Sequence, residues 1–494
     1  MRAMRAGGFP SRLLAAVALV ALAGCAVGPD YKRPEAPTPV AYKELKGWKP
    51  SEPKEAASNA PWWSIYGDPA LDGLERQIDI SNQNLKAAEA AFRQARALVT
   101  EARAQFFPTV DANGAGTRSG QGRHTGSSSS VSRATGFVQN EYNLSASASW
   151  EIDVWGRIRR TVESQEASAQ ASAADLASAR LSAQAELASD YFQLRVADQL
   201  KRLLDDTVEA DTRSLQITQN KYASGTAAKS DVAQAQAQVE NVRAQSINVG
   251  VQRAQLEHAI AVLIGKPPSD FALAPAPMRT DVPVSPTGLP SELLERRPDI
   301  AAAERSMASA NAQIGVAIAA YYPTITLQAS YGFVSTALES LIQTSHSVWS
   351  FGPNAAETVF DGGLRSGQVA AARASYDQTV ANYRQTVLAG FQQVEDELAA
   401  LRVLEQQAEV QDRAVKASEE AVQLILNQYR AGTVDYTTVV TAQTTALGNE
   451  QTALTVMQNR LVASVTLVEA LGGGWDASLL PPADDLDRGM ASGQ

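Results

Sequence analysis

The 494-residue sequence contains one cysteine and three histidines, so it offers few groups for metal binding or nucleophilic chemistry. A single cysteine forms neither an intrachain disulfide nor a cysteine-based metal site. The histidines are His124, His258 and His346, and no two of them have the spacing of metal ligands. Gly472-Gly473-Gly474 lacks the Lys-Ser/Thr pair of a phosphate-binding loop and follows a predicted helix rather than a strand. The sequence therefore predicts a protein that is not an enzyme and holds no cofactor.

Aromatic residues and positive charge are also scarce. Aromatic side chains make up 6% of the chain, and the formal net charge is −10 with no basic stripe, which argues against nucleic acid as a partner. Alanine, glutamine and serine are abundant instead. Small side chains fill a thick globular core poorly, but they suit closely packed helices. The one long apolar run, Leu13 to Leu22, is shorter than the roughly 20 residues that a helix needs to cross a bilayer.

That apolar run belongs to a predicted signal peptide, residues 1–24. Arg2, Arg5 and Arg12 supply its positive end, and Leu-Ala-Gly-Cys closes it at Cys25. This ending resembles the lipobox of bacterial lipoproteins, which implies cleavage before Cys25 and acylation of that residue. Acyl chains would then hold the N-terminus on a membrane. The alternative is an ordinary signal peptide with an incidental cysteine.

Two segments have the period of β-strands. Apolar residues alternate with polar ones from Tyr142 to Asp153 and from Pro323 to Phe333. Each segment has the length of a tilted transmembrane strand with one lipid-facing side. Weaker strands are predicted over 109–117 and 348–360. A soluble sheet is the alternative, because alternation is normal there too. Four strands do not close a barrel, and open edges are not tolerated in lipid, so a membrane barrel would need several chains. Three chains with twelve strands are the simplest solution.

Long helical patterns fill most of the remaining chain. Helices are predicted over 72–105, 157–223, 230–264, 299–320 and 364–430. A 3-4-3-4 seam begins at Val232 and recurs 207 residues later from Val439, which indicates coiled-coil packing.

The motif Tyr-x-x-Gly-Thr occurs once in each half, at Tyr222 to Thr226 and at Tyr429 to Thr433. Gly225 and Gly432 would provide the positive φ that ends one helix, and the Thr or Ser that follows would cap the next. The sequence therefore predicts two helical hairpins with tight tips and an internal repeat. Its segments are the signal peptide (1–24), a lipidated tether (25–60), the first repeat (61–265), a Pro-rich connector (266–298), the second repeat (299–472) and a disordered C-terminal tail (473–494).

Several motifs together resemble one family. They are Cys25 with Gly28-Pro29-Asp30-Tyr31, Trp62-Trp63 with Asp68-Pro69, the run from Leu289 to Ile300, and Phe360-Asp361-Gly362-Gly363. The chain resembles the lipoprotein (NodT-type) branch of the TolC-like outer membrane efflux proteins. That resemblance implies an α+β membrane protein. It would be a homotrimer with a shared twelve-stranded barrel in the outer membrane and a helical tunnel in the periplasm. It also implies a periplasmic adaptor and an inner-membrane resistance-nodulation-division (RND) pump as partners.

The resemblance also assigns a gate to the two tips. Tyr222, Gly225 and Gly432 lie in the tip motifs, while Asp231 and Tyr429 match residues of the family's closed-state network. The family's charged positions fall here on neutral residues, which are Val434, Thr438, Thr441 and Thr444. With Thr437 and Thr445, these threonines form a polar face, called the threonine face below. We therefore expect a gate held by packing and hydroxyl contacts, with little sensitivity to salt. The alternative is that these threonines simply face a neighbouring helix.

Two other functions remain open at this point. One keeps the duct but changes its cargo to a metal ion or a secreted polypeptide. The other is structural, a lipid-anchored trimeric coiled-coil stalk or adhesin, which would need no conductance.

Overall fold

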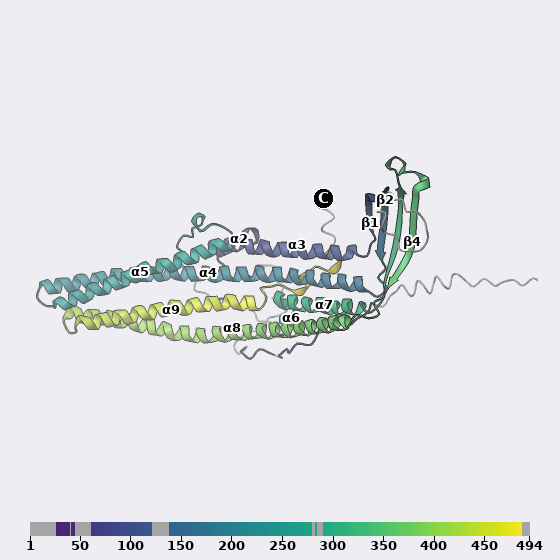
Figure 1. The fold of residues 1–494 in the computed structure, drawn as a ribbon. Helices are drawn as coiled ribbons and strands as arrows, with labels where there is room; N and C mark the ends of the chain where they lie inside the picture. Colours follow the sequence, from purple (N-terminus) through teal and green to yellow (C-terminus); the bar gives the residue numbers. More distant parts are fainter. Residues whose placement is uncertain are drawn as a thin grey trace, which may run out of the picture.

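The computed structural model describes residues 26–39, 41–44, 61–120, 138–278, 282–283 and 290–486. Cys25 and the signal peptide lie outside these residues. The chain is elongated, with a small sheet at one end and two helical tips at the other (Figure 1). No helix of the described part is both long and apolar enough to cross a membrane.

The order of elements is the same in both halves. The first half contains η1 (Trp62–Tyr66), α2 (Pro69–Ser81), α3 (Gln83–Ala104), β1 (Thr109–Gly120), β2 (Val138–Glu151), α4 (Arg157–Ala223) and α5 (Lys229–Leu263). The second contains α6 (Pro290–Arg296), α7 (Pro298–Ala319), β3 (Thr324–Ser335), β4 (Ser347–Ala356), α8 (Leu364–Ala431) and α9 (Tyr436–Ala470). Helices α4 and α8 have 67 and 68 residues, so each is roughly 100 Å long. The predicted internal repeat is confirmed.

The sheet is antiparallel, in the order β1-β2-β3-β4. Its register pairs Leu144 with Phe333 and Tyr331 with Trp349, and cross-strand partners share a face. One face is therefore apolar and the other carries the alternating Ser, Thr and Asn residues. The predicted alternation is confirmed, although β1 continues to Gly120 and β4 ends at Ala356 rather than at residue 360. Strands β1 and β4 form the two edges, and neither edge has a partner in the described part of the chain.

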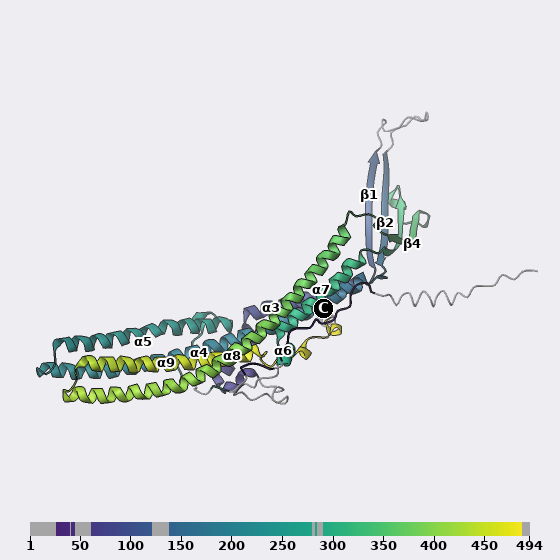
Figure 2. The ribbon, with the colours of Figure 1, turned by 90° about the horizontal axis from the view of Figure 1, so that it is seen from below.

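Two helical hairpins form the long body, with α4 packed on α5 and α8 packed on α9 (Figure 2). Most of the predicted seam of α5 is buried, at Ala235, Val239, Val242, Ser246, Val249 and Ile260. The equivalent seam of α9 is buried at Val439, Ala446, Val456, Ala463, Leu467 and Ala470. The predicted coiled-coil packing is confirmed, and the α4/α5 tip extends farther than the α8/α9 tip (Figures 1 and 2).

The described N-terminal residues, 26–39 and 41–44, form an extended strap along the helices. At its start, the amide of Val27 donates to the carbonyl of Trp155 over 3.0 Å, near the base of the sheet. Farther on, the Tyr31 hydroxyl donates to Glu304 of α7 over 2.5 Å. At its end, the amides of Lys43 and Glu44 donate to the carboxylate of Glu395 on α8 over 2.7 and 3.0 Å. The predicted tether is extended, but its described residues are docked on the fold.

Three boundaries differ from the sequence prediction. The single helix predicted over 72–105 is two helices, because the Asn82 side chain accepts from the Leu85 amide at 2.9 Å and so caps α3. The connector contains α6. The described part of the tail is packed on the fold, and the backbone carbonyl of its buried Leu486 accepts a hydrogen bond from Arg96 of α3 over 3.0 Å. Such tertiary contacts are not visible in local sequence patterns.

Candidate functional site

Both tips end a helix with the predicted left-handed glycine. Gly225 has φ +73° and Gly432 has φ +79°, and added Cβ atoms would meet nothing within 4 Å. The backbone conformation, rather than space, therefore favours glycine. The expected capping role of the next residue is wrong. The hydroxyls of Thr226 and Thr433 donate back to the carbonyls of Lys221 and of Gln428 in the preceding helices, each over 3.0 Å.

Aspartates cap the helices that follow the tips. The Asp435 carboxylate accepts from the amide and the hydroxyl of Thr438 at 3.0 and 2.7 Å, and these bonds lower its pKa. Asp231 accepts from the Ala228 amide at 3.3 Å. Its hydrogen-bond partners therefore lie beside the start of α5, and within one chain it is not bonded to Tyr429. The matched gate position Asp231 serves here as a helix cap.

Tyr429 joins the two hairpins. Its ring is 4% exposed, and its hydroxyl donates to Thr218 of α4 over 3.3 Å. The ammonium of Lys221 lies 4.4 Å from the ring centroid and donates to the Tyr429 carbonyl. Tyr436 packs edge-on against the same ring, with centroids 5.3 Å apart. Tyr222, which occupies the position of Tyr429 in the first repeat, is 47% exposed, so the two tip motifs are not equivalent in their contacts.

The sequence motifs point to Tyr429 but not to Lys221 or Tyr436. A lysine beside a tip has the pattern of a solvated residue, and nothing in its spacing indicates a contact with the other hairpin. Tyr436 could have been found, because an aromatic residue three positions before the seam residue Val439 fits the same helix face.

The threonine face is exposed in the single chain. The hydroxyls of Thr441 and Thr445 donate to carbonyls one turn earlier in α9, over 2.9 and 2.8 Å. Thr437 alone reaches the other hairpin, at 3.4 Å from Gln234 of α5. The face borders a groove of about 480 Å³ between α8 and α9. Because most of these hydroxyls are satisfied by their own helix or its cap, the threonines themselves present methyl groups and weak polarity, and the Asp435 carboxylate lies beside them in the groove.

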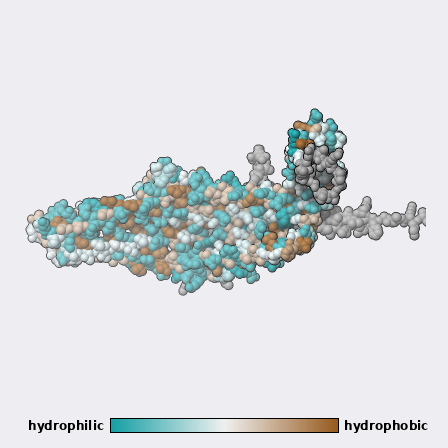
Figure 3. Space-filling view, viewed as in Figure 1, coloured by the Kyte–Doolittle hydropathy of each residue, from teal (hydrophilic) through white to brown (hydrophobic). Residues whose placement is uncertain are grey.

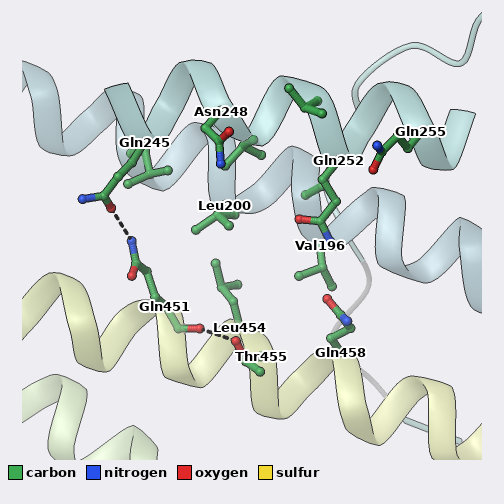
Figure 4. A pocket seen from close by; sticks show the side chains of 14 residues that line it. Val196, Leu200, Gln245, Asn248, Gln252, Gln255, Gln451, Leu454, Thr455 and Gln458 are labelled. Carbon is green, nitrogen blue, oxygen red and sulfur yellow. Dashed lines mark hydrogen bonds between the residues drawn. The ribbon is translucent and has the colours of Figure 1, made fainter. Parts of the chain in front are cut away.

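A second groove of about 600 Å³ lies farther from the tips, between α9 and the α4/α5 hairpin (Figure 4). Leu200 and Leu454 point into it from opposite sides. Amide side chains line its rim, and one pair joins the two hairpins, Gln451 donating to Gln245 over 3.3 Å. The groove therefore offers an apolar floor and many neutral hydrogen-bonding groups. Among the residues that the structure describes, no group of three or more His, Cys, Asp or Glu side chains is arranged to hold a metal ion.

Known proteins share both the sequence and this architecture. The model of the outer membrane efflux protein family matches residues 75–266 and 289–473. The chain belongs to this family. A probable efflux pump outer membrane protein of Pseudomonas putida, TtgC, is 31% identical over 468 residues, covering 94% of this chain and 96% of its own. The cation efflux system protein CusC of Escherichia coli is 27% identical over 470 residues, covering 94% and 99%.

Solved structures of relatives agree with the fold. The outer-membrane channel OprN superposes with a TM-score of 0.84 at 29% identity, covering 91% of this chain and all of its own. The open-state MtrE channel of Neisseria gonorrhoeae gives 0.80 at 28% identity, covering 92% and 99%. The family is one of outer membrane channels and is not defined by a reaction. The expected family and α+β fold are confirmed, whereas the gating roles of the tip residues remain predictions.

Proposed function

We propose that three copies of this chain form a passive exit duct across the outer membrane, as the last component of a tripartite efflux pump. One observation carries the proposal, the four-stranded sheet with an apolar face, a polar face and two open edges. In lipid, each edge needs a partner strand, and copies of the same sheet can supply it. Three sheets would close a twelve-stranded barrel with its polar faces toward the lumen.

The helical body supports the same assembly. Large apolar side chains remain exposed on α5 and α8, namely Ile247, Val251, Leu388, Val403, Val410 and Leu424. In the space-filling view, apolar patches are distributed along the whole body between polar regions (Figure 3). Helices with such unpartnered apolar residues pack against one another, and neighbouring copies would cover them. The three hairpin pairs would then surround a tunnel continuous with the barrel.

The ends of this duct would meet different partners. Ala26 lies against Gly156 at the base of the sheet, within 2.8 Å of the position a Cβ atom would take there. Cys25 immediately precedes Ala26, so its acyl chains would enter the membrane leaflet near the base of the sheet. At the other end, a periplasmic adaptor with helical hairpins would fit the amide-lined groove between α9 and the α4/α5 hairpin. An inner-membrane RND pump would supply the cargo.

The tips would form the gate. The contacts of Tyr429 with Lys221 and Thr218 hold the two hairpins of one chain together, while the threonine face would meet the other copies. Selectivity would then come mainly from the width and wall charge of the pore, not from a binding site.

The cargo is tested with a deletion strain, with and without the restored gene. Growth is scored against antibiotics, dyes, detergents, bile salts, toluene, and copper or silver. We expect sensitivity to several unrelated amphiphiles, as relatives named for toluene, solvent and antibiotic efflux suggest. Sensitivity to a metal alone would change the cargo to a cation, in line with the name of CusC. Purified protein that never conducts in planar bilayers, even with its tips splayed by mutation, would favour the structural stalk.

A further inference from the structure

A group of five side chains lies buried where the two hairpins meet, inside the tips. Asp211, Ser214 and Thr218 recur at intervals of three and four residues, so they share one face of α4. Tyr429 of α8 bonds to Thr218, and Tyr436 of α9 lies beside Ser214 and Asp211. None of the five is more than 4% exposed in the single chain. Their burial therefore does not depend on a neighbouring copy.

Three oxygen-bearing groups of this cluster lack a protein partner within the described residues. They are the Oδ2 atom of Asp211, the hydroxyl of Ser214 and the phenol of Tyr436. A buried polar oxygen without a partner is costly, so a carboxyl in this place is a point of instability. These three groups satisfy one another best when the carboxyl carries a proton, because it then donates as well as accepts.

No cation balances the Asp211 carboxylate among the described contacts. Gln238 of α5, which is neutral, lies near enough to lower the pKa of this carboxyl, and Tyr436 of α9 is a titratable group near it. Burial raises the pKa of Asp211 to about 6, partly opposed by Gln238, and burial also raises the pKa of Tyr436. Several charged side chains of the surrounding elements have partners outside the cluster: Glu209 with Arg213, Glu240 with Arg243, Asp231 and Asp435 at helix N-termini, Lys221 on the Tyr429 carbonyl, and Arg430 on Asn427.

We propose that Asp211 is a proton-binding site that sets how firmly the two hairpins of each chain hold together at the tip. This inference rests on the proposed function in one respect, namely that separation of the hairpins opens the duct. Protonated Asp211 donates to Tyr436 or Ser214, and the hairpins stay packed. The ionised form needs water, which reaches it only when α9 moves away from α4.

The direction of the pH effect follows from the two states. Packed hairpins hold the proton up to pH 6 or so, whereas a hydrated aspartate releases it near its ordinary pKa of 3.8. Separation therefore releases a proton. Its free energy becomes more favourable as the pH rises from 3.8 to about 6 and stays constant above that range. The equilibrium for separation should increase about tenfold per chain between pH 5 and pH 7.5.

Hydrogen–deuterium exchange of the purified full-length protein measures this separation without relying on transport. We expect protection of the start of α9, residues 436–447, to fall about tenfold per chain between pH 5 and pH 7.5 after correction for intrinsic rates. Asp211→Asn should remove this dependence and keep high protection throughout. Asp206→Asn is the matched control, because Asp206 is an exposed aspartate on the same helix. An equal pH dependence in wild type and Asp211→Asn would overturn the proposal.

A second variant keeps the test valid if Asp211→Asn fails to fold. Tyr436→Phe removes a hydroxyl to which protonated Asp211 donates, so the pH at which protection falls should move downward; an unchanged midpoint would count against the proposal. Conductance in planar bilayers separates this inference from the proposed function. A pH-dependent exchange that Asp211→Asn abolishes, in a protein that never conducts, would support the proton site and refute the duct. A conducting protein with pH-independent exchange would support the duct and refute the proton site.

Discussion

Glu75 provides a quantitative test of the packing at the middle of the body. This residue of α2 is 0% exposed, and neither carboxyl oxygen has a protein partner in the described chain. Burial, with smaller contributions from the carboxylates of Asp79 and Asp72, raises its pKa to about 9. Folding therefore requires proton uptake whenever the pH is above 4.5, the ordinary value for this group. At pH 7 that uptake destabilises the folded chain by about 3 kcal/mol.

The sign of the effect makes the prediction specific. Because the folded-state pKa is raised, the cost is absent below pH 4.5, grows up to pH 9 and is constant above it. Glu75→Gln keeps the shape and removes the titration, so the variant should be more stable than wild type by an amount that grows with pH. The buried amide still lacks a partner, so about 3 kcal/mol at pH 7 is an upper bound.

Thermal unfolding of the detergent-solubilised protein, followed by circular dichroism, measures this difference. We expect nearly equal midpoints at about pH 5 and a clearly higher midpoint for Glu75→Gln at about pH 8. Glu101→Gln, an exposed carboxyl of α3, should change neither. A difference between Glu75→Gln and wild type that stays constant or shrinks as the pH rises would refute the reasoning.

Four further predictions concern the tips and the anchor. Lys221→Met removes a carbonyl hydrogen bond and a cation–π contact with Tyr429, worth about 1–2 kcal/mol together, and should raise the open probability in planar bilayers roughly tenfold. Gly432→Ala should cost only about 1–2 kcal/mol in thermal unfolding because its Cβ has open space, whereas Gly472→Ala, whose Cβ would lie 2.0 Å from a carbonyl oxygen, should give no folded protein on purification. Cys25→Ser should lower the outer membrane yield but leave a folded trimer, and loss of all trimer on native gels would contradict this. With the threonine face at the gate, the open probability should change little between about 0.1 and 1 M salt, and a steep change would argue for a charged latch.

The parts that sequence predicts well here are those fixed by local period. Alternation from Tyr142 onward predicts β2 and its two faces, and the lone glycines predict both tips. The break at Asn82 was not predicted, because its side chain also bonds across the fold, to the Leu263 carbonyl over 2.8 Å. The ordered tail was missed for the same reason, since Leu486 is buried by helices that are distant in sequence.

The candidate site shows a similar division. The tip motifs give Tyr222 and Tyr429 equivalent positions in the repeat, yet of the two only Tyr429 is buried. The difference arises from the unequal reach of the two hairpins, which no local pattern records. Asp211 was missed because a polar residue in a long polar helix normally faces water. Its spacing with Ser214 and Thr218 is a signal that helix-face analysis of α4 could have detected.

The N-terminal strap also constrains the order in which the molecule can be completed. Its last described residues bond to Glu395, and Glu44 also pairs with Arg402, so residues made among the first dock on a helix made among the last. During synthesis this segment has no surface to bind until most of α8 has been delivered. The docked strap is thus a late event, and a protease site placed within it would distinguish nascent chains from finished ones.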